Sequence, residues 1–179
     1  MLTTAWSHEG PAAVRYPRGT GTGINPGTEL EPLPIGEAEI CRQGEQVAIL
    51  AFGSRVADAL EAGNEINATV VNMRFVKPLD KNLIAEMAER HSLIITVEEN
   101  AVQGGAGSAV NEVLQQQGAG VRVLNLGIPD QFIGHGSYEE QLAECGIDTA
   151  GILAAIAEIT REPGFAHTTD IQGKRQHLN

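Results

Sequence analysis

Four short apolar runs separated by helix-length segments constrain the fold of this chain more than any other feature. The runs cover residues 47–52, 69–73, 93–97 and 121–125. The first of them is continuously apolar, as expected for a strand that is covered on both faces. Because strands alternate with helical segments, the sequence predicts an α/β fold whose parallel strands are joined by right-handed crossovers.

The helical segments and one further strand complete this pattern. Ser54 is predicted to cap a first helix and Asp80 a second. Further helices are predicted at 107–117, 138–144 and 149–160. Residues 36–42 and 46–52 are predicted to form a hairpin that turns at Gln43 and Gly44. The hairpin would add an antiparallel edge strand to the sheet.

The first 35 residues differ in composition from the rest of the chain. They hold five of the eight prolines, interleaved with glycines. Proline lacks a backbone donor and glycine costs backbone entropy, so this stretch is predicted to be extended loop, with 12–16 as a candidate strand. We interpret it as the end of a preceding domain plus a linker, so the chain is expected to be a fragment of a longer protein. The tail, 161–179, is polar.

Charge and cysteine content exclude several classes of function. With 12 basic and 23 acidic side chains, the net charge is 12 − 23 = −11. No clustered basic surface is expected, and therefore no nucleic-acid partner. Neither an apolar run of membrane-spanning length nor a signal-peptide core is present, so we expect no membrane partner and a cytoplasmic location. Cys41 and Cys145 match no disulfide, metal or redox motif.

Ligands of open α/β sheets bind at the carboxyl ends of the strands. One loop there, residues 104–108, is glycine-rich and precedes a helix, whose N-terminus could hold an anion. The loop lacks the spacing of dinucleotide and P-loop motifs. The alternative is a tight turn that needs a positive φ angle and close packing against another chain.

Three other groups of polar residues follow the strands. Glu98 and Glu99 could perform acid–base chemistry, but adjacent strand residues point to opposite faces. We therefore expect them to cap loop amides or to pair with Arg74. Arg74 and Lys77 form a lone basic pair, which is weak evidence for a site. His135 lies between two glycines without a nucleophile or a second histidine, so neither a triad nor a metal site is supported.

The most specific feature is a pair of arginines in the proline-rich segment. Arg15 and Arg18 flank the stiff dipeptide Tyr16-Pro17. The planar guanidinium binds phosphate or carboxylate with two parallel hydrogen bonds. In an acidic protein, two such cations on a rigid segment suggest a small anionic substrate, although a segment without a binding role remains open.

Five motifs occur in the order AVRYPRG, LPIGEAEI, VNMRFVKPLD, VEENAVQGGAGSAVNEVL and LNLGIPDQFIGHG. Together they resemble the C-terminal portion of the 1-deoxy-D-xylulose-5-phosphate synthase family, over roughly residues 1–160. The resemblance implies a three-layer transketolase C-terminal-like domain at 36–160, with a mostly parallel five-stranded sheet and one antiparallel edge strand. It also implies that 1–20 end a pyrimidine-binding domain, that 21–35 are a linker and that 161–179 are a tail.

The resemblance further implies a function for the full-length protein. The family uses thiamine diphosphate and Mg²⁺ to condense pyruvate with glyceraldehyde 3-phosphate, releasing CO2, in the synthesis of isoprenoid, thiamine and pyridoxal precursors. Arg15 matches the family arginine that contacts the phosphate of the aldehyde. The motifs that bind cofactor and metal and the catalytic residues are expected outside this chain, which would be inactive alone.

The resemblance also suggests a homodimer, with packing through the 98–108 and 127–136 loops. Two alternatives remain open. The chain could be the C-terminal domain of a transketolase or of a 2-oxoacid dehydrogenase β subunit. It could also be a standalone, non-enzymatic dimerisation module.

Overall fold

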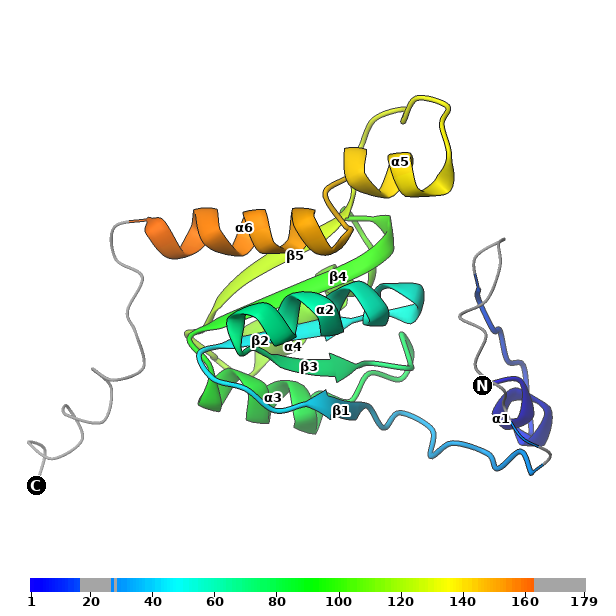
Figure 1. Ribbon diagram of the computed structural model, residues 1–179. Helices are drawn as coiled ribbons and strands as arrows, with labels where there is room; N and C mark the ends of the chain where they lie inside the picture. Colours follow the sequence, from blue (N-terminus) through cyan, green and yellow to red (C-terminus); the bar gives the residue numbers. More distant parts are fainter. Residues whose placement is uncertain (17–26, 28, 163–179) are drawn as a thin grey trace, which may run out of the picture.

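A five-stranded sheet in the order β1-β3-β2-β4-β5 forms the centre of the computed structural model, which describes residues 1–16, 27 and 29–162 (Figure 1). The pairs β2–β3, β2–β4 and β4–β5 are parallel, and only the edge strand β1 runs antiparallel to its neighbour. The predicted fold class is confirmed. The strands are β1 (Glu39–Arg42), β2 (Val47–Ala51), β3 (Thr69–Asn72), β4 (Leu93–Ala101) and β5 (Arg122–Ile128).

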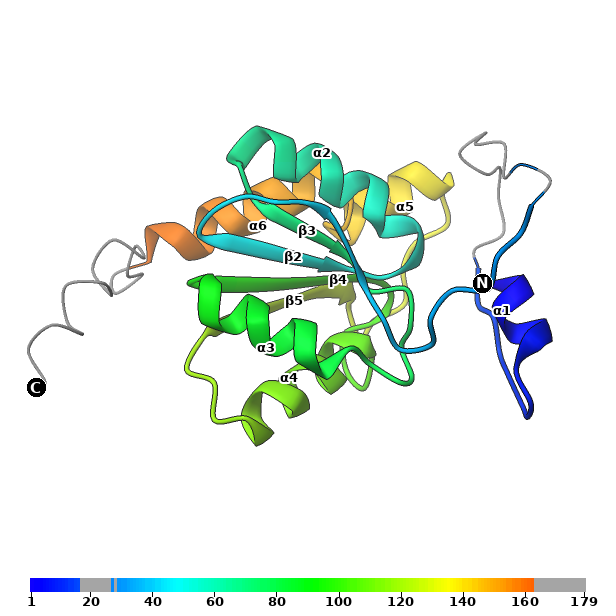
Figure 2. The ribbon, with the colours of Figure 1, turned by 90° about the horizontal axis from the view of Figure 1, so that it is seen from below.

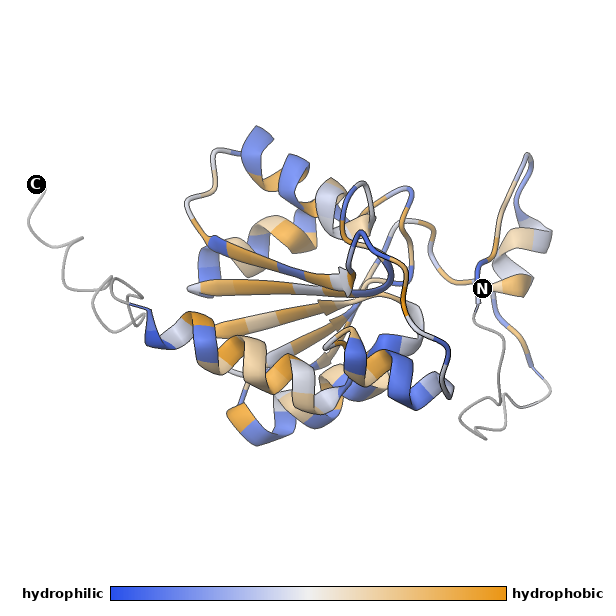
Figure 3. Cartoon of the chain, turned by 90° about the horizontal axis from the view of Figure 1, so that it is seen from above, coloured by the Kyte–Doolittle hydropathy of each residue, from blue (hydrophilic) through white to orange (hydrophobic). Residues whose placement is uncertain are grey.

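Helices cover both faces of the sheet and make three layers. Helices α2, α5 and α6 lie on one face, and α3 and α4 lie on the other (Figure 2). Apolar residues concentrate in the strands and on the helix surfaces that face them (Figure 3). The helices are α2 (Val56–Ile66), α3 (Lys81–Arg90), α4 (Ala106–Gln116), α5 (Tyr138–Glu144) and α6 (Thr149–Arg161).

The central strand β2 shows why the fold needs both helical layers. All five of its residues are buried. Val47, Ile49 and Ala51 pack in the cluster that contains α2 and α6, whereas Ala48 and Leu50 pack in the cluster that contains α3 and α4. Successive side chains of a strand point to opposite faces, so a continuously apolar strand must be covered twice.

The predicted hairpin between the first two strands is wrong. Strand β1 pairs with β3, and β3 lies between β1 and β2. The connection, residues 43–46, is fixed to the α2–β3 turn: Glu45 N–H donates to Asn67 O at 2.7 Å, and Gly44 N–H donates to Thr69 Oγ1 at 3.0 Å. A Cβ on Gly44 would lie 2.2 Å from Asn67 O, so glycine permits this close approach. Because these contacts fix the connection at the α2–β3 turn, β1 pairs with the outer edge of β3 and not with β2.

The two predicted helix caps had different outcomes. Asp80 caps α3 as predicted, because Leu83 N–H donates to Asp80 Oδ1 at 3.0 Å. Ser54 caps no helix: it lies in a short 3-10 turn, Gly53–Arg55, and makes no capping hydrogen bond. Its hydroxyl instead donates to Glu99 Oε2.

The N-terminal segment contains a short helix, α1 (Leu2–Ser7), where the sequence predicted extended loop. The first glycine and proline are Gly10 and Pro11, so nothing in residues 2–7 breaks a helix. The candidate strand at 12–16 is not formed, since its backbone pairs with no strand among the described residues.

Parts of the predicted linker and nearly all of the predicted polar tail, with Pro17 and Arg18, lie outside the described residues. Within the described part, no helix is long and apolar enough to cross a membrane.

Candidate functional site

The carboxyl ends of the parallel strands bring together polar groups from four parts of the chain. The last residues of β4 include Glu98 and Glu99, whose side chains go to different partners. Around them lie the Gly53–Arg55 turn after β2, the glycine-rich loop before α4, the start of α5 and Arg15 from the N-terminal segment.

The carboxylate of Glu98 caps α4. Its Oε2 accepts from Ala106 N–H at 2.8 Å and its Oε1 accepts from Gly107 N–H at 2.7 Å, and the residue is buried. A carboxylate at a helix N-terminus is stabilised by two otherwise unpaired amides and by the helix dipole. The predicted capping of loop amides is confirmed for Glu98. These amides are therefore filled by the chain's own carboxylate, and the glycine-rich loop does not offer them to an external anion.

The glycines of this loop permit close packing within the chain. Gly104 has a φ angle of +72°, as predicted for a tight turn. A Cβ on Gly105 would lie 2.3 Å from Ala101 O, and one on Gly107 would lie 2.3 Å from Asn125 Nδ2. The packing partners are β4 and β5 of the same domain, where the sequence had suggested another chain.

The carboxylate of Glu99 lies on the other face of the sheet. Its Oε2 accepts from Ser54 Oγ at 2.6 Å and from Tyr138 Oη at 2.7 Å. Arg55 Nε lies 3.9 Å from the same oxygen. Glu99 thus joins the turn after β2 to the start of α5.

Arg55 is the buried cation of this cluster, with 4% of its surface exposed. It forms an ion pair with Asp58 at 2.9 Å and donates to Ile147 O at 3.3 Å and to Tyr138 Oη at 3.1 Å. Its guanidinium also lies 5.8 Å from the centre of the Tyr138 ring, within the range of a cation–π contact. Burial raises the pKa of Tyr138, and its hydrogen bond to Glu99 raises it further. The phenol stays protonated and donates to Glu99.

Arg15 reaches this cluster from the N-terminal segment. Its Nη2 donates to the backbone oxygen of Glu99 at 3.2 Å, and the side chain is exposed. The contact joins residues 84 positions apart. It places the arginine expected to bind phosphate at the carboxyl edge of the sheet.

The structure does not bring the other predicted site residues into the cluster. Arg74 pairs with Glu39 on β1, not with either carboxylate of β4. Lys77 is exposed. His135 is exposed in the loop before α5, and no hydrogen bond or ion pair joins it to another described residue.

Neither cysteine belongs to a reactive site. Cys41 and Cys145 are free thiols, and burial raises the pKa of each. A raised pKa keeps a thiol protonated and poorly nucleophilic. In the described part of the chain, no group of three or more His, Cys, Asp or Glu side chains could hold a metal ion.

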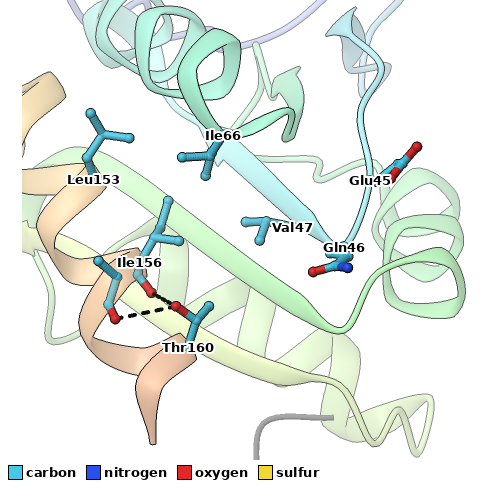
Figure 4. A pocket seen from close by; sticks show the side chains of 8 residues that line it. Glu45, Gln46, Val47, Ile66, Leu153, Ile156 and Thr160 are labelled. Carbon is cyan, nitrogen blue, oxygen red and sulfur yellow. Dashed lines mark hydrogen bonds between the residues drawn. The ribbon is translucent and has the colours of Figure 1, made fainter. Parts of the chain in front are cut away.

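A shallow apolar hollow of about 440 Å³ lies at the opposite, amino end of the strands (Figure 4). Its lining consists of the apolar residues Val47, Ile66, Leu153, Ile156 and Ala157 and the polar residues Glu45, Gln46 and Thr160. The Thr160 hydroxyl is bonded to Ile156 O of its own helix. With a mainly apolar lining, the hollow has the character of incomplete packing between α2 and α6 rather than of a catalytic site.

The sequence missed Ser54, Arg55 and Tyr138 as members of the cluster. A buried arginine has no sequence pattern of its own, because its burial depends on partners from α2 and α5. The helix that carries Tyr138 was predicted with its observed bounds, 138–144, and a local pattern stabilises its start. Ser137 and Glu140 form a capping box, in which Glu140 N–H donates to Ser137 Oγ and Ser137 N–H donates to Glu140 Oε2.

The three-layer domain matches a known class of domain. The family model described as "Transketolase, C-terminal domain" matches residues 36–152. The chain belongs to the transketolase C-terminal domain family.

Curated relatives identify the branch of that class. The 1-deoxy-D-xylulose-5-phosphate synthase of Methylobacillus flagellatus is 60% identical over 156 residues, which are 87% of this chain and 25% of the relative. The synthase of Nitrosomonas europaea is 54% identical over 158 residues, which are 88% of this chain and 26% of the relative. The resemblance to the C-terminal portion of this synthase family is confirmed. The chain spans about a quarter of the length of the curated relatives it matches.

Solved structures support the same fold. A split-gene transketolase, described as an inactive β4 tetramer, matches with a TM-score of 0.67 and 30% identity over 80% of this chain and 46% of that chain. The transketolase of Campylobacter jejuni matches with a TM-score of 0.51 and 19% identity over 69% of this chain and 18% of that one. The second likeness shows the fold alone.

Proposed function

We propose that this chain is the C-terminal part of a 1-deoxy-D-xylulose-5-phosphate synthase. The full-length protein would condense pyruvate with glyceraldehyde 3-phosphate and release CO2, using thiamine diphosphate and Mg²⁺. The observation that carries this proposal is the 60% identity to a curated synthase over 87% of the chain. The product would serve the synthesis of isoprenoid, thiamine and pyridoxal precursors, and the enzyme would act in the cytoplasm.

The described residues do not fit the cofactor or its metal. The amides at the start of α4, which could have held a diphosphate, donate to the Glu98 carboxylate instead. The Glu99 carboxylate is bound by Ser54 and Tyr138. We therefore assign the site of the cofactor to the rest of the longer protein.

The chain's own contribution to the substrate is Arg15. The side chain is exposed, and its one bond to the described residues goes to a neutral backbone oxygen. A guanidinium carries five N–H donors in a planar fork, so this bond still allows it to bind a phosphate with two parallel hydrogen bonds. Arg15 would contact the phosphate of glyceraldehyde 3-phosphate.

A second contribution would be subunit packing in a homodimer. The loop after β5 exposes Phe132 completely, at 106% of its reference surface, and the N-terminal segment exposes Trp6 at 91%. Large exposed aromatic side chains favour interfaces. The 98–108 and 127–136 loops would pack against the partner subunit, and the isolated chain would be inactive.

The test is Arg15→Ala in the full-length enzyme. Loss of a charge-assisted hydrogen bond costs about 1.5–3 kcal/mol, so kcat/KM for glyceraldehyde 3-phosphate should fall roughly 10- to 150-fold. The KM for pyruvate should not change, and neither should the turnover of unphosphorylated D-glyceraldehyde. Arg90→Ala is the matched control, because Arg90 is an exposed arginine on α3 that pairs with Glu86.

An unchanged kcat/KM for the phosphorylated aldehyde would remove the role of Arg15. Turnover of a ketose donor in place of pyruvate would favour the transketolase alternative over the synthase.

A further inference from the structure

We propose that Glu99 is a positioning residue for the substrate phosphate, because it orients the backbone oxygen to which Arg15 binds and holds its own carboxylate away from Arg15. This inference rests on the proposed role of Arg15 and extends it to a residue that does not touch the substrate.

Regular strand pairing does not hold the backbone at the end of β4. Pairing with β2 ends at Val97, whose partner is Ala51. Pairing with β5 is irregular between Val97 and Ala101. The peptide of Glu99 therefore lies in a stretch that no regular ladder holds on either side, and side chains must fix its orientation.

Side chains anchored on both faces of the sheet fix this stretch. Glu98 is bound to the start of α4 on one face of the sheet. Glu99 is bound to Ser54 and Tyr138 on the other face. The two anchored side chains fix the Cα atoms of both residues, and the backbone carbonyl of Glu99 is bonded directly to one of these atoms. The oxygen of this carbonyl, which accepts from Arg15 Nη2 at 3.2 Å, is thereby restricted in position.

The cluster also keeps the charge of the Glu99 carboxylate apart from Arg15. Among the described residues, Arg15 makes no ion pair with the Glu99 carboxylate, although it binds the same residue's backbone oxygen. The carboxylate is occupied by two hydroxyl donors and lies near the buried guanidinium of Arg55. A carboxylate free to turn toward Arg15 would compete with a phosphate for it. The cluster thus keeps the positive charge of Arg15 available to an anionic substrate.

The experiment compares phosphorylated and unphosphorylated aldehydes in the full-length enzyme. Glu99→Ala should lower kcat/KM for glyceraldehyde 3-phosphate about 10-fold, as expected for a misplaced binding group. It should leave kcat/KM for D-glyceraldehyde and the KM for pyruvate unchanged. Glu99→Gln, which keeps an acceptor oxygen for Ser54 and Tyr138, should recover most of the loss. Glu139→Ala is the matched control, because Glu139 is exposed beside Tyr138 and no hydrogen bond or ion pair joins it to the described residues of the cluster.

A double variant tests whether Glu99 acts through Arg15. If it does, Arg15→Ala with Glu99→Ala should be no worse toward glyceraldehyde 3-phosphate than Arg15→Ala alone. Tyr138→Phe is a milder variant that removes one donor to Glu99. It should lower kcat/KM for the phosphorylated aldehyde about 3-fold with the same selectivity, and it decides the matter if Glu99→Ala fails to fold.

The outcomes separate the two proposals. If Arg15→Ala does not discriminate between the two aldehydes, the proposed function of Arg15 fails, and this inference fails with it. If Arg15→Ala discriminates but the Glu99 and Tyr138 variants affect both aldehydes equally, or neither, only this inference is overturned. Additive losses in the double variant would also overturn it.

Discussion

Glu98 and Glu99 are neighbours in the sequence, but they serve opposite faces of the sheet. Glu98 is buried at 4% exposure, and two amides of α4 donate to it. The side chain of Glu99 keeps 26% of its surface exposed, and two hydroxyl groups donate to it beside Arg15. The strand end is buried on the face that α4 covers, whereas it stays partly exposed to solvent on the face that α5 covers.

The difference shows how one strand end can combine stability with function. A carboxylate that caps a buried helix N-terminus stabilises the fold and is not available for chemistry. A carboxylate held by hydroxyl groups at a half-exposed edge contributes less to stability and can organise a site. We therefore expect substitution of Glu98 to lower mainly the free energy of unfolding, and substitution of Glu99 to lower mainly the activity.

The largest effect on stability should come from Glu98→Ala. Each of its two charge-assisted hydrogen bonds contributes about 1.5 kcal/mol, so the free energy of unfolding should fall by about 3 kcal/mol. Urea denaturation of the purified chain with linear extrapolation measures this change. Glu112→Ala, an exposed site on the same helix, should change stability by less than about 0.5 kcal/mol. Equal effects of the two substitutions would contradict the capping role.

A smaller loss is expected from Gly107→Ala, which tests how closely the α4 layer is packed. The new Cβ would lie 2.3 Å from Asn125 Nδ2 and 2.5 Å from Thr96 Oγ1. Overpacking of about 3 kcal/mol should outweigh the about 1 kcal/mol that alanine gains over glycine in a helix. The net loss, about 2 kcal/mol, can be read from the same denaturation curves.

Gly120→Ala provides the control for this substitution. A Cβ there would meet no atom within 4 Å, so stability should stay the same or rise slightly. A stable Gly107→Ala variant would mean that α4 can move away from β5.

A third substitution, Glu99→Ala, tests how much the partly exposed face of the strand end contributes to the free energy of unfolding, by the same urea denaturation. Arg55 would keep its ion pair with Asp58 and its bond to Ile147 O. No buried charge is left without a partner, so the loss should be about 1 kcal/mol. A loss as large as that of Glu98→Ala would show that both faces of the strand end are equally structural, and it would weaken the comparison.

Local patterns in the sequence were sufficient for most of the fold. The alternation of strands and helices, the doubly covered β2 and the Asp80 cap all depend on residues close together in the chain, and the structure confirms each of them. The hairpin failed because the path of residues 43–46 is set by contacts with Asn67 and Thr69, more than 20 positions away.

The candidate site was predicted only in part, for the same reason. The sequence placed Glu98 and Glu99 on opposite faces, because strand geometry requires it. It left open whether either glutamate caps loop amides or pairs with Arg74. It assigned Ser54 to a helix cap, since a serine after a strand is a common N-cap. Only the tertiary fold shows that Ser54 and Tyr138 donate to Glu99 and that Arg55 is buried beside them.

The smallest effect at neutral pH is expected at His91, the C-cap residue of α3, which lies just before β4 and at the opposite end of that strand from Glu98 and Glu99. His91 is buried, with Nε2 at 2.7 Å from Thr69 Oγ1 and Nδ1 at 2.9 Å from Met87 O. Burial lowers the pKa of His91 below its ordinary value of 6.5. The unfolded chain therefore binds more protons below about pH 6.5, and stability should fall as the pH falls from there toward the folded-state pKa, while staying level above it. Denaturation at stepped pH should show this slope in the parent chain and in His135→Gln, whose histidine is exposed. The slope should be reduced in His91→Gln, and an unreduced slope would assign the acid sensitivity to other groups.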